Sequence, residues 1–130
     1  MENIKLSINR AEEKKLPSNP DAEQSLIGSV LVNNDIIDEI SNIVNSGKFF
    51  DPMHRKIYEV IENLNNKGMI ANPITLKNYF ENDSGLTEVG GVDYLVKLTR
   101  FSSSIKQAID YAKIIHEMYV KRELIFIADN

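Results

Sequence analysis

The chain has 130 residues, of which 42% are hydrophobic and 26% charged, and its formal net charge is −4. This length fits one domain with a real core, and the composition argues against a disordered chain. The lack of cysteine excludes a disulfide framework and thiolate metal sites, and it is consistent with a cytoplasmic protein. The slightly acidic balance disfavours tight DNA binding by these residues alone, because neutralising phosphates requires lysine and arginine.

The beginning of the chain mixes charges of both signs with few apolar side chains. We therefore predict that residues 1–16 form a flexible N-terminal tail. The first residues lack the apolar stretch of a signal peptide, and no later run approaches the ~20 apolar residues of a membrane span. No membrane association is expected.

Three segments open with a polar capping residue followed by proline, which is the pattern of a helix N-terminus. They are Asn19-Pro20, Asp51-Pro52 and Asn72-Pro73, and apolar residues recur at helical spacing behind each pair. Another helix is predicted from Asn34 or Asp35 to Ser46-Gly47. Its apolar stripe consists of Ile36, Ile37, Ile40, Ile43 and Val44.

Glycines punctuate these helices. Gly68 is predicted to end the third helix, and Gly90 or Gly91 is predicted to adopt a positive φ before a short fifth helix. Residues 82–85 are predicted to form a turn. Gly28 lies inside the first helix, where glycine costs about 1 kcal/mol relative to alanine, so we expect close helix packing there.

The last segment predicts one long helix of about 27 residues, or about 40 Å, because no glycine or proline interrupts it. A helix of this length should project beyond a globule about 30 Å across. The predicted fold is therefore all-α. A compact globule of about five short helices (17–101) precedes the first helix of a hairpin (102–130), and we expect the chain to be truncated before the return helix and further domains.

Residues suited to catalysis or to binding nucleotides and metals are not evident. Gly47-Lys48 lacks the upstream glycine of a phosphate-binding loop, and a helix end explains it better. His54 and His116 are far apart and lack metal-ligand spacing, so His54 is interpreted as a packed or capping side chain and His116 as a partly exposed helix residue. We predict no catalytic, cofactor-binding or metal-binding residue.

Five motifs occur in an order that resembles the N-terminal domain of the bacterial replicative DNA helicases of the DnaB family. The first runs from Leu16 to Gly28 and resembles P-x-x-x-E-A-E-Q-x-x-L-G. The others are the segments Phe49 to Tyr58, Gly68 to Leu76, Val89 to Leu95, and Tyr111 to Ile125. Each motif is weak alone, but together they cover most of the chain after residue 16.

The resemblance implies a non-catalytic assembly and partner-binding domain. Helicases of this family are hexameric rings that unwind DNA at the replication fork, with ATP and Mg²⁺ used by a C-terminal domain. Their N-terminal domains pair through helical hairpins into a collar. This collar recruits the C-terminal domain of primase and, in some lineages, a helicase loader. DNA is contacted mainly through the full ring.

The resemblance also suggests contact residues. Primase contacts would correspond to Asp21, Tyr94 and Ile125. The apolar face of the long helix supplies the candidates for a subunit interface, namely Ile105, Ile109, Ala112, Ile115, Tyr119 and Leu124. Each has a purely structural alternative: a helix-terminal charge for Asp21, and internal packing for Tyr94 and for the apolar side chains.

Two other classes of function remain as alternatives. A small helical nucleic-acid-binding domain would need a basic recognition helix, but Arg55, Lys56 and Lys67 are interspersed with Glu59 and Glu62. A self-contained enzyme would need titratable groups that converge in a pocket.

Overall fold

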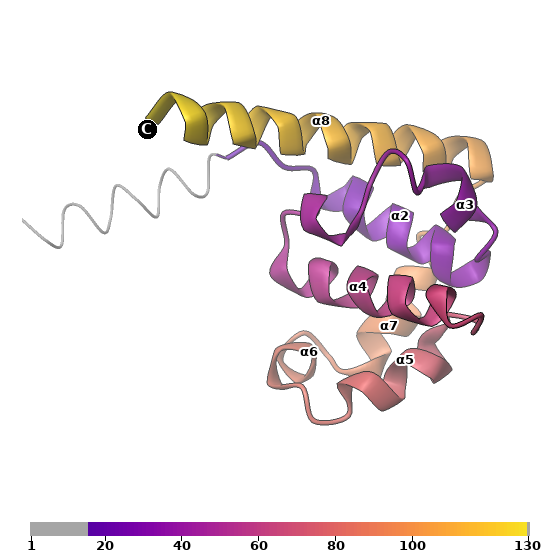
Figure 1. The fold of residues 1–130 in the computed structure, drawn as a ribbon. Coiled ribbons are helices and arrows are strands. Elements are labelled where there is room, and N and C mark those ends of the chain that lie inside the picture. Colours follow the sequence, from indigo (N-terminus) through magenta and orange to yellow (C-terminus); the bar gives the residue numbers. More distant parts are fainter. Residues whose placement is uncertain (1–15, 130) are drawn as a thin grey trace, which may run out of the picture.

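The computed structural model describes residues 16–129, and within this range it contains helices and no strands. Figure 1 shows the helices in layers, with the long helix α8 (Ile105–Asp129) lying across α2 (Pro20–Val32) and α3 (Ile36–Ile40). Below them follow α4 (Pro52–Asn66), α5 (Pro73–Phe80), α6 (Ser84–Glu88) and α7 (Val92–Thr99). The all-α prediction is confirmed. No helix among the described residues is both long enough and apolar enough to cross a membrane.

The predicted helix starts are confirmed at all three cap-and-proline pairs. The Asn19 side chain accepts from the amide of Ala22, and Asp51 accepts from the amides of Met53 and His54. Asn72 forms a reciprocal capping box with Thr75. These side chains satisfy amides that have no partner within the first turn, which fixes where each helix begins.

Helix α2 lies at the centre and packs against α3, α4, α7 and α8. Its residue Gly28 allows the closest of these approaches, because an added Cβ would lie 1.9 Å from the carbonyl oxygen of Leu98 in α7. The expectation of close packing at Gly28 is therefore confirmed. The adjacent Ser29 hydroxyl accepts from the amide of Ser103, at 2.9 Å, and so fixes the loop between α7 and α8.

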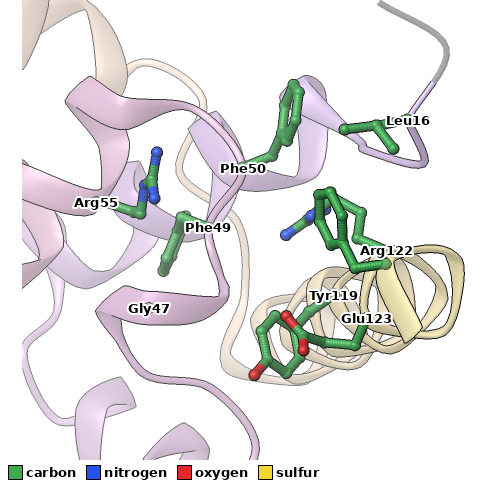
Figure 2. Close-up of a pocket in the computed structure, with 9 residues that line it drawn as sticks. Leu16, Gly47, Phe49, Phe50, Arg55, Tyr119, Arg122 and Glu123 are labelled. Carbon is green, nitrogen blue, oxygen red and sulfur yellow. The ribbon is translucent and has the colours of Figure 1, made fainter. Parts of the chain in front are cut away.

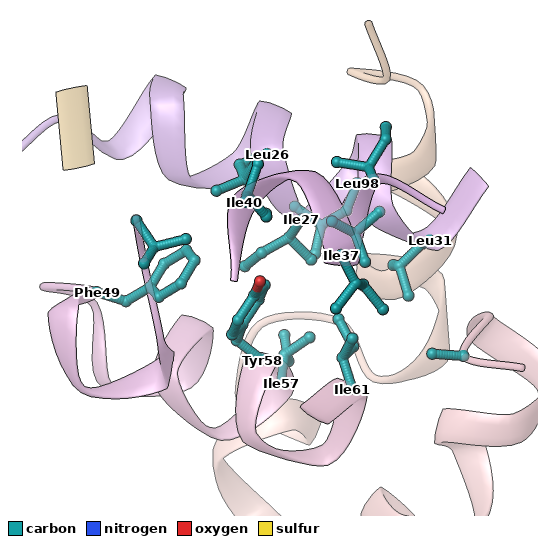
Figure 3. Close-up of a cluster of buried hydrophobic side chains, with 14 of the residues drawn as sticks. Leu26, Ile27, Leu31, Ile37, Ile40, Phe49, Ile57, Tyr58, Ile61 and Leu98 are labelled. Carbon is teal, nitrogen blue, oxygen red and sulfur yellow. The ribbon is translucent and has the colours of Figure 1, made fainter. Parts of the chain in front are cut away.

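The core lies between α2, α3, α4 and α7, and its side chains are drawn in Figure 3. The rings of Phe49 and Tyr58 pack with centroids 4.8 Å apart. Burial raises the pKa of the Tyr58 phenol, and the nearby charge of Glu62 raises it further. The other labelled members of this cluster are aliphatic: Leu26, Ile27, Leu31, Ile37, Ile40, Ile57, Ile61 and Leu98.

Two local predictions were wrong. The second helix is shorter than predicted, because α3 ends at Ile40 and a separate 3₁₀ turn, η1 (Ser46–Lys48), follows. Asn45 adopts an extended conformation and caps η1, which leaves Val44 buried but outside a helix. The predicted turn at residues 82–85 includes the start of α6, which Asp83 caps by accepting from the amide of Leu86.

The glycine predictions were correct. Gly68 has φ 72°, Gly90 has φ 119° and Gly91 has φ 64°, all in the region that favours glycine. Gly90 and Gly91 join α6 to α7 and thereby set where Tyr94, in the first turn of α7, meets α2 and α4.

Candidate partner-binding surfaces

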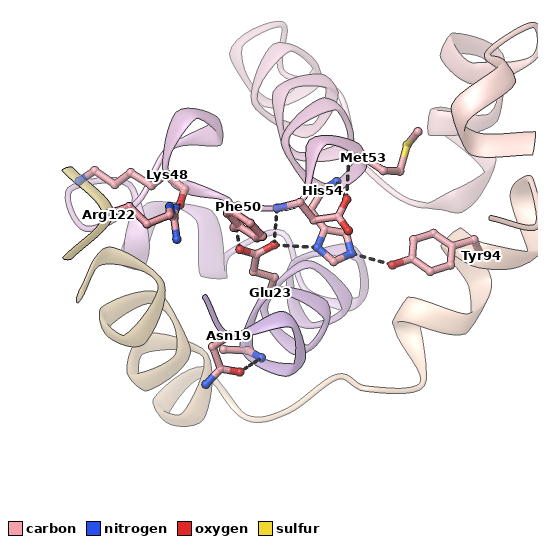
Figure 4. Close-up of polar contacts among 10 residues, drawn as sticks. Asn19, Glu23, Lys48, Phe50, Met53, His54, Tyr94 and Arg122 are labelled. Atoms are coloured by element: carbon pink, nitrogen blue, oxygen red, sulfur yellow. Dashed lines mark hydrogen bonds and ion pairs between the residues drawn. The ribbon is translucent and has the colours of Figure 1, made fainter. Parts of the chain in front are cut away.

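A buried polar cluster connects α2, α4 and α7 (Figure 4). The carboxylate of Glu23 accepts from the amides of Phe50, at 2.7 Å, and Asp51, at 3.2 Å. It lies 2.9 Å from Nδ1 of His54, whose Nε2 lies 2.6 Å from the hydroxyl of Tyr94. The side chains of Glu23 and His54 are both almost fully buried.

The hydrogen-bonding roles within this cluster follow from its chemistry. An ionised carboxylate only accepts, so the proton on His54 lies on Nδ1 and points to Glu23. When the imidazole carries this one proton, Nε2 accepts from the Tyr94 hydroxyl. Burial raises the pKa of this phenol, and the charges of Asp51 and Glu23 act in the same direction, against a hydrogen bond with Gln24. Tyr94 therefore keeps its proton at neutral pH.

His54 was predicted to be a packed or capping side chain, and the structure confirms that it is packed. The burial of Glu23 was not predicted from the sequence. The sequence around Glu23 does not indicate burial, because the hydrogen-bonding partners of its carboxylate lie in α4 and in the loop before α4.

A second polar contact fastens α8 to the globule. Arg122 is 7% exposed, and its guanidinium donates to the carbonyl oxygens of Pro17 and Lys48, both at 2.8 Å. It also lies over the ring of Phe50, 5.1 Å from its centroid. Burial lowers the pKa of this guanidinium, and the charge of Glu23 is the next largest influence and opposes the shift. This role was not predicted from the sequence, because nothing in the periodicity separates Arg122 from its charged neighbours.

Beside Arg122 lies a groove of about 250 Å³ between α8 and the segment that leads into α4 (Figure 2). Phe50 and Arg55 line one wall, while Tyr119 and Glu123 of α8 line the other. The lining mixes aromatic rings with charges of both signs. We assign it no ligand.

Two of the candidate primase contacts lie close together. Asp21 is exposed in the first turn of α2, three residues before Gln24 on the same side of the helix. Tyr94 is half-buried and is hydrogen-bonded with Gln24, so the two candidates share one surface. Ile125 lies on α8, whose C-terminal end is well separated from α7 in Figure 1.

The candidate subunit contacts on α8 divide into two groups. Ile105 and Leu124 are exposed, while Ile109 and Tyr119 are partly covered. Ala112 and Ile115, however, are buried within the chain itself, because this part of α8 packs on α2 and α3. Internal packing, the structural alternative, applies to these two, and we withdraw them as subunit contacts.

The exposed apolar side chains of α8 concentrate near its C-terminal end. Val120, Leu124 and Ile127 follow at intervals of four and three residues, so they form one stripe on the helix. At 100° per residue this stripe lies opposite Arg122, on the face turned away from the globule. Ile125 and Phe126 are also exposed, but at 100° per residue they lie nearer to the Arg122 side of the helix than to this stripe. We call Val120, Leu124 and Ile127 the distal stripe.

Comparison with known proteins identifies the family. The model described as "DnaB-like helicase N terminal domain" matches residues 15–117. The replicative DNA helicase DnaB of Rickettsia bellii is 45% identical over 114 residues, which cover 88% of this chain and 23% of that protein. The Pasteurella multocida protein of the same name is 32% identical over 114 residues, which cover 88% of this chain and 24% of that protein.

A solved structure agrees with these matches. The crystal structure of the N-terminal domain of DnaB helicase from Mycobacterium tuberculosis superposes with a TM-score of 0.79 at 28% sequence identity, covering 88% of this chain and 83% of that one. This chain spans about a quarter of the length of the curated relatives it matches. From the order of its motifs, its all-helical fold and these matches, we conclude that the chain belongs to the family of DnaB-like helicase N-terminal domains.

Proposed function

We propose that this chain is the N-terminal assembly and partner-binding domain of an ATP-dependent replicative DNA helicase that works in the cytoplasm. The domain contributes contacts to other helicase subunits and to the C-terminal domain of primase, and in some lineages to a helicase loader. ATP and Mg²⁺ are used by a separate C-terminal domain of the whole protein, and DNA is held by the whole ring.

The observation that carries this proposal is the distal stripe. Leu124 is 60% exposed and Ile127 is 69% exposed, on a helix whose opposite face is fastened to the globule. A row of exposed apolar side chains at helical spacing suits a second amphipathic helix, because burying them removes apolar surface from water. An equivalent α8 from another subunit, with the rest of its hairpin, has the required shape and chemistry.

Self-association is tested by light scattering over a range of concentrations, on the wild-type chain and on Leu124→Asp. We expect the wild type to gain mass with concentration and Leu124→Asp to remain monomeric. Ile74→Asp is the matched control, because Ile74 is 78% exposed but lies on α5. A wild-type chain that stays monomeric at high micromolar concentration would refute self-association through α8 in this chain.

Primase binding is tested by calorimetry with the purified C-terminal domain of primase from the same organism. Tyr94→Ala should weaken binding by about tenfold or more, as truncation of a central aromatic contact usually does. Tyr79→Ala is the control, because Tyr79 is a 47% exposed tyrosine on α5. Equal affinities for the wild type and Tyr94→Ala would exclude Tyr94 from the primase contact.

A further inference from the structure

The hydroxyl of Tyr94 is hydrogen-bonded to a buried side chain, although Tyr94 itself is only half-buried. It meets Nε2 of His54 at 2.6 Å, and His54 is in turn held by Glu23 at 2.9 Å. Glu23 cannot swing away, because its two oxygens also accept from two backbone amides. The side chain of Tyr94 is therefore connected through two buried groups to the backbone in front of α4.

Apart from packing against the core and the contact with Gln24, Tyr94 receives little support from the backbone around it. Helix α7 begins after Gly90 and Gly91, both with positive φ, and it has no side-chain cap. The added Cβ of Gly91 would have open space around it, so packing does not restrain this turn tightly. An uncapped first turn after two glycines does not by itself hold an aromatic side chain in one orientation.

We propose that His54, oriented by Glu23, is a positioning residue that fixes the orientation of Tyr94 for primase binding. This inference rests on the proposed function and adds a role for two residues that a partner does not touch. Both are buried, so they act only through Tyr94. A side chain held in its binding orientation loses less conformational entropy when the partner arrives.

The arrangement also predicts the chemistry of the partner. Because the phenol O–H points to Nε2 of His54, the tyrosine oxygen can only accept further hydrogen bonds, and Gln24 already supplies one, so a partner group at this oxygen would have to be a hydrogen-bond donor. The neighbouring Asp21 is an exposed acid, and a basic side chain complements it. The primase surface over Tyr94 and Asp21 should therefore carry lysine, arginine or an amide N–H group.

His54→Asn and His54→Gln are similar in polarity, so comparing them distinguishes loss of the contact with Tyr94 from a general loss of stability. In His54→Asn the side-chain amide takes the place of Nδ1, so the contact with Glu23 is kept and the contact with Tyr94 is lost. In His54→Gln the amide reaches the place of Nε2, so the contact with Tyr94 is kept. Tyr94→Phe removes the hydroxyl and leaves the ring.

Affinity for the primase C-terminal domain is measured by calorimetry for each folded variant. We expect Tyr94→Phe and His54→Asn each to weaken binding about three- to tenfold, as for one hydrogen bond. His54→Gln keeps the contact with Tyr94 but loses the contact with Glu23, so it should weaken binding less than His54→Asn does, and His54→Asn should add nothing in the Tyr94→Phe background. Equal affinities of His54→Asn and His54→Gln, whether both weakened or both unchanged, would overturn the positioning role.

If primase does not bind over Tyr94, Tyr94→Ala leaves the affinity unchanged. This result distinguishes failure of the proposed primase contact from failure of the positioning role. A measurement on the wild type alone keeps the inference testable if a variant fails to fold. Nitrogen NMR of the wild-type chain should show the Nδ1-protonated form of His54, and side-chain couplings should show one χ1 rotamer of Tyr94. The Nε2-protonated form, or an averaged rotamer, would contradict the proposal.

Discussion

Both halves of α8 carry apolar residues at helical spacing, but they differ in what covers these residues. In the first half, Ala108, Ala112 and Ile115 are buried against the globule. In the second half, the side chains of the distal stripe are exposed on the opposite side of the helix from Arg122. Apolar periodicity therefore indicates that a helix face tends to be covered, without indicating whether its own chain or another one covers it.

The two halves of α8 differ more in the size of their apolar side chains than in hydrophobicity. The buried half uses alanine where α8 crosses α2 and α3, and small side chains allow helix axes to approach closely. The exposed half presents longer aliphatic side chains, which suit packing into a groove between two helices. Substitutions along α8 should therefore change stability at one end and association at the other.

The largest effect is expected from Ile115→Ala. Ile115 is 2% exposed, so truncation removes buried apolar atoms and leaves a cavity against the globule. We expect the free energy of unfolding to fall by about 2–5 kcal/mol. Urea denaturation monitored by circular dichroism measures this loss. A loss below about 0.5 kcal/mol would show that the first half of α8 is not part of the core.

Arg122→Ala should have an intermediate effect, because Arg122 holds the second half of α8 to the globule. It removes donors from the carbonyl oxygens of Pro17 and Lys48 and the contact with Phe50. We expect a loss of about 2 kcal/mol in the same denaturation experiment. Arg122→Lys should recover only part of it, because an ammonium group does not span both carbonyls as the planar guanidinium does.

Lys121→Ala is the matched control for Arg122→Ala. Lys121 is half-exposed and pairs with Glu117 one turn earlier on the same helix. Exposed pairs of this kind contribute about 0.3–0.5 kcal/mol. If both alanine variants lost the same small amount, Arg122 would be an ordinary surface residue.

The smallest effect on stability is expected from Leu124→Ala, within about 0.5 kcal/mol, because its side chain has little contact to lose. The measurement is made at a dilute concentration, where association does not contribute to the free energy of unfolding. A loss comparable to that of Ile115→Ala would mean that Leu124 is covered by its own chain, and the contrast between the halves of α8 would disappear.

The helix framework was accessible from the sequence, because its determinants are local. The caps at Asn19, Asp51 and Asn72, the positive φ at the glycines, and the long uninterrupted α8 all depend on neighbours in the chain. Helix α6 was missed because its residues, Ser-Gly-Leu-Thr-Glu, have the composition of a turn and contain a single buried apolar side chain, Leu86.

The polar cluster was not accessible in the same way. Its bonds join residues about 30 and 40 positions apart, as in Glu23 with His54 and His54 with Tyr94. Periodicity does not report such pairings, and a single glutamate or histidine on a helix is usually solvated. Arg122 was missed for the same reason, since its partners are two backbone carbonyls brought near by the fold.

The two contacts that hold α8 to the globule predict how its backbone amides exchange with solvent. Ser103 is bound to Ser29 just before the helix, and Arg122 is bound to the globule further along it. Amides between these points should exchange only when the whole domain opens, whereas amides after Arg122 should exchange by fraying from the helix end. Covering the end of α8 by another subunit would move its amides from the fast class into the slow one.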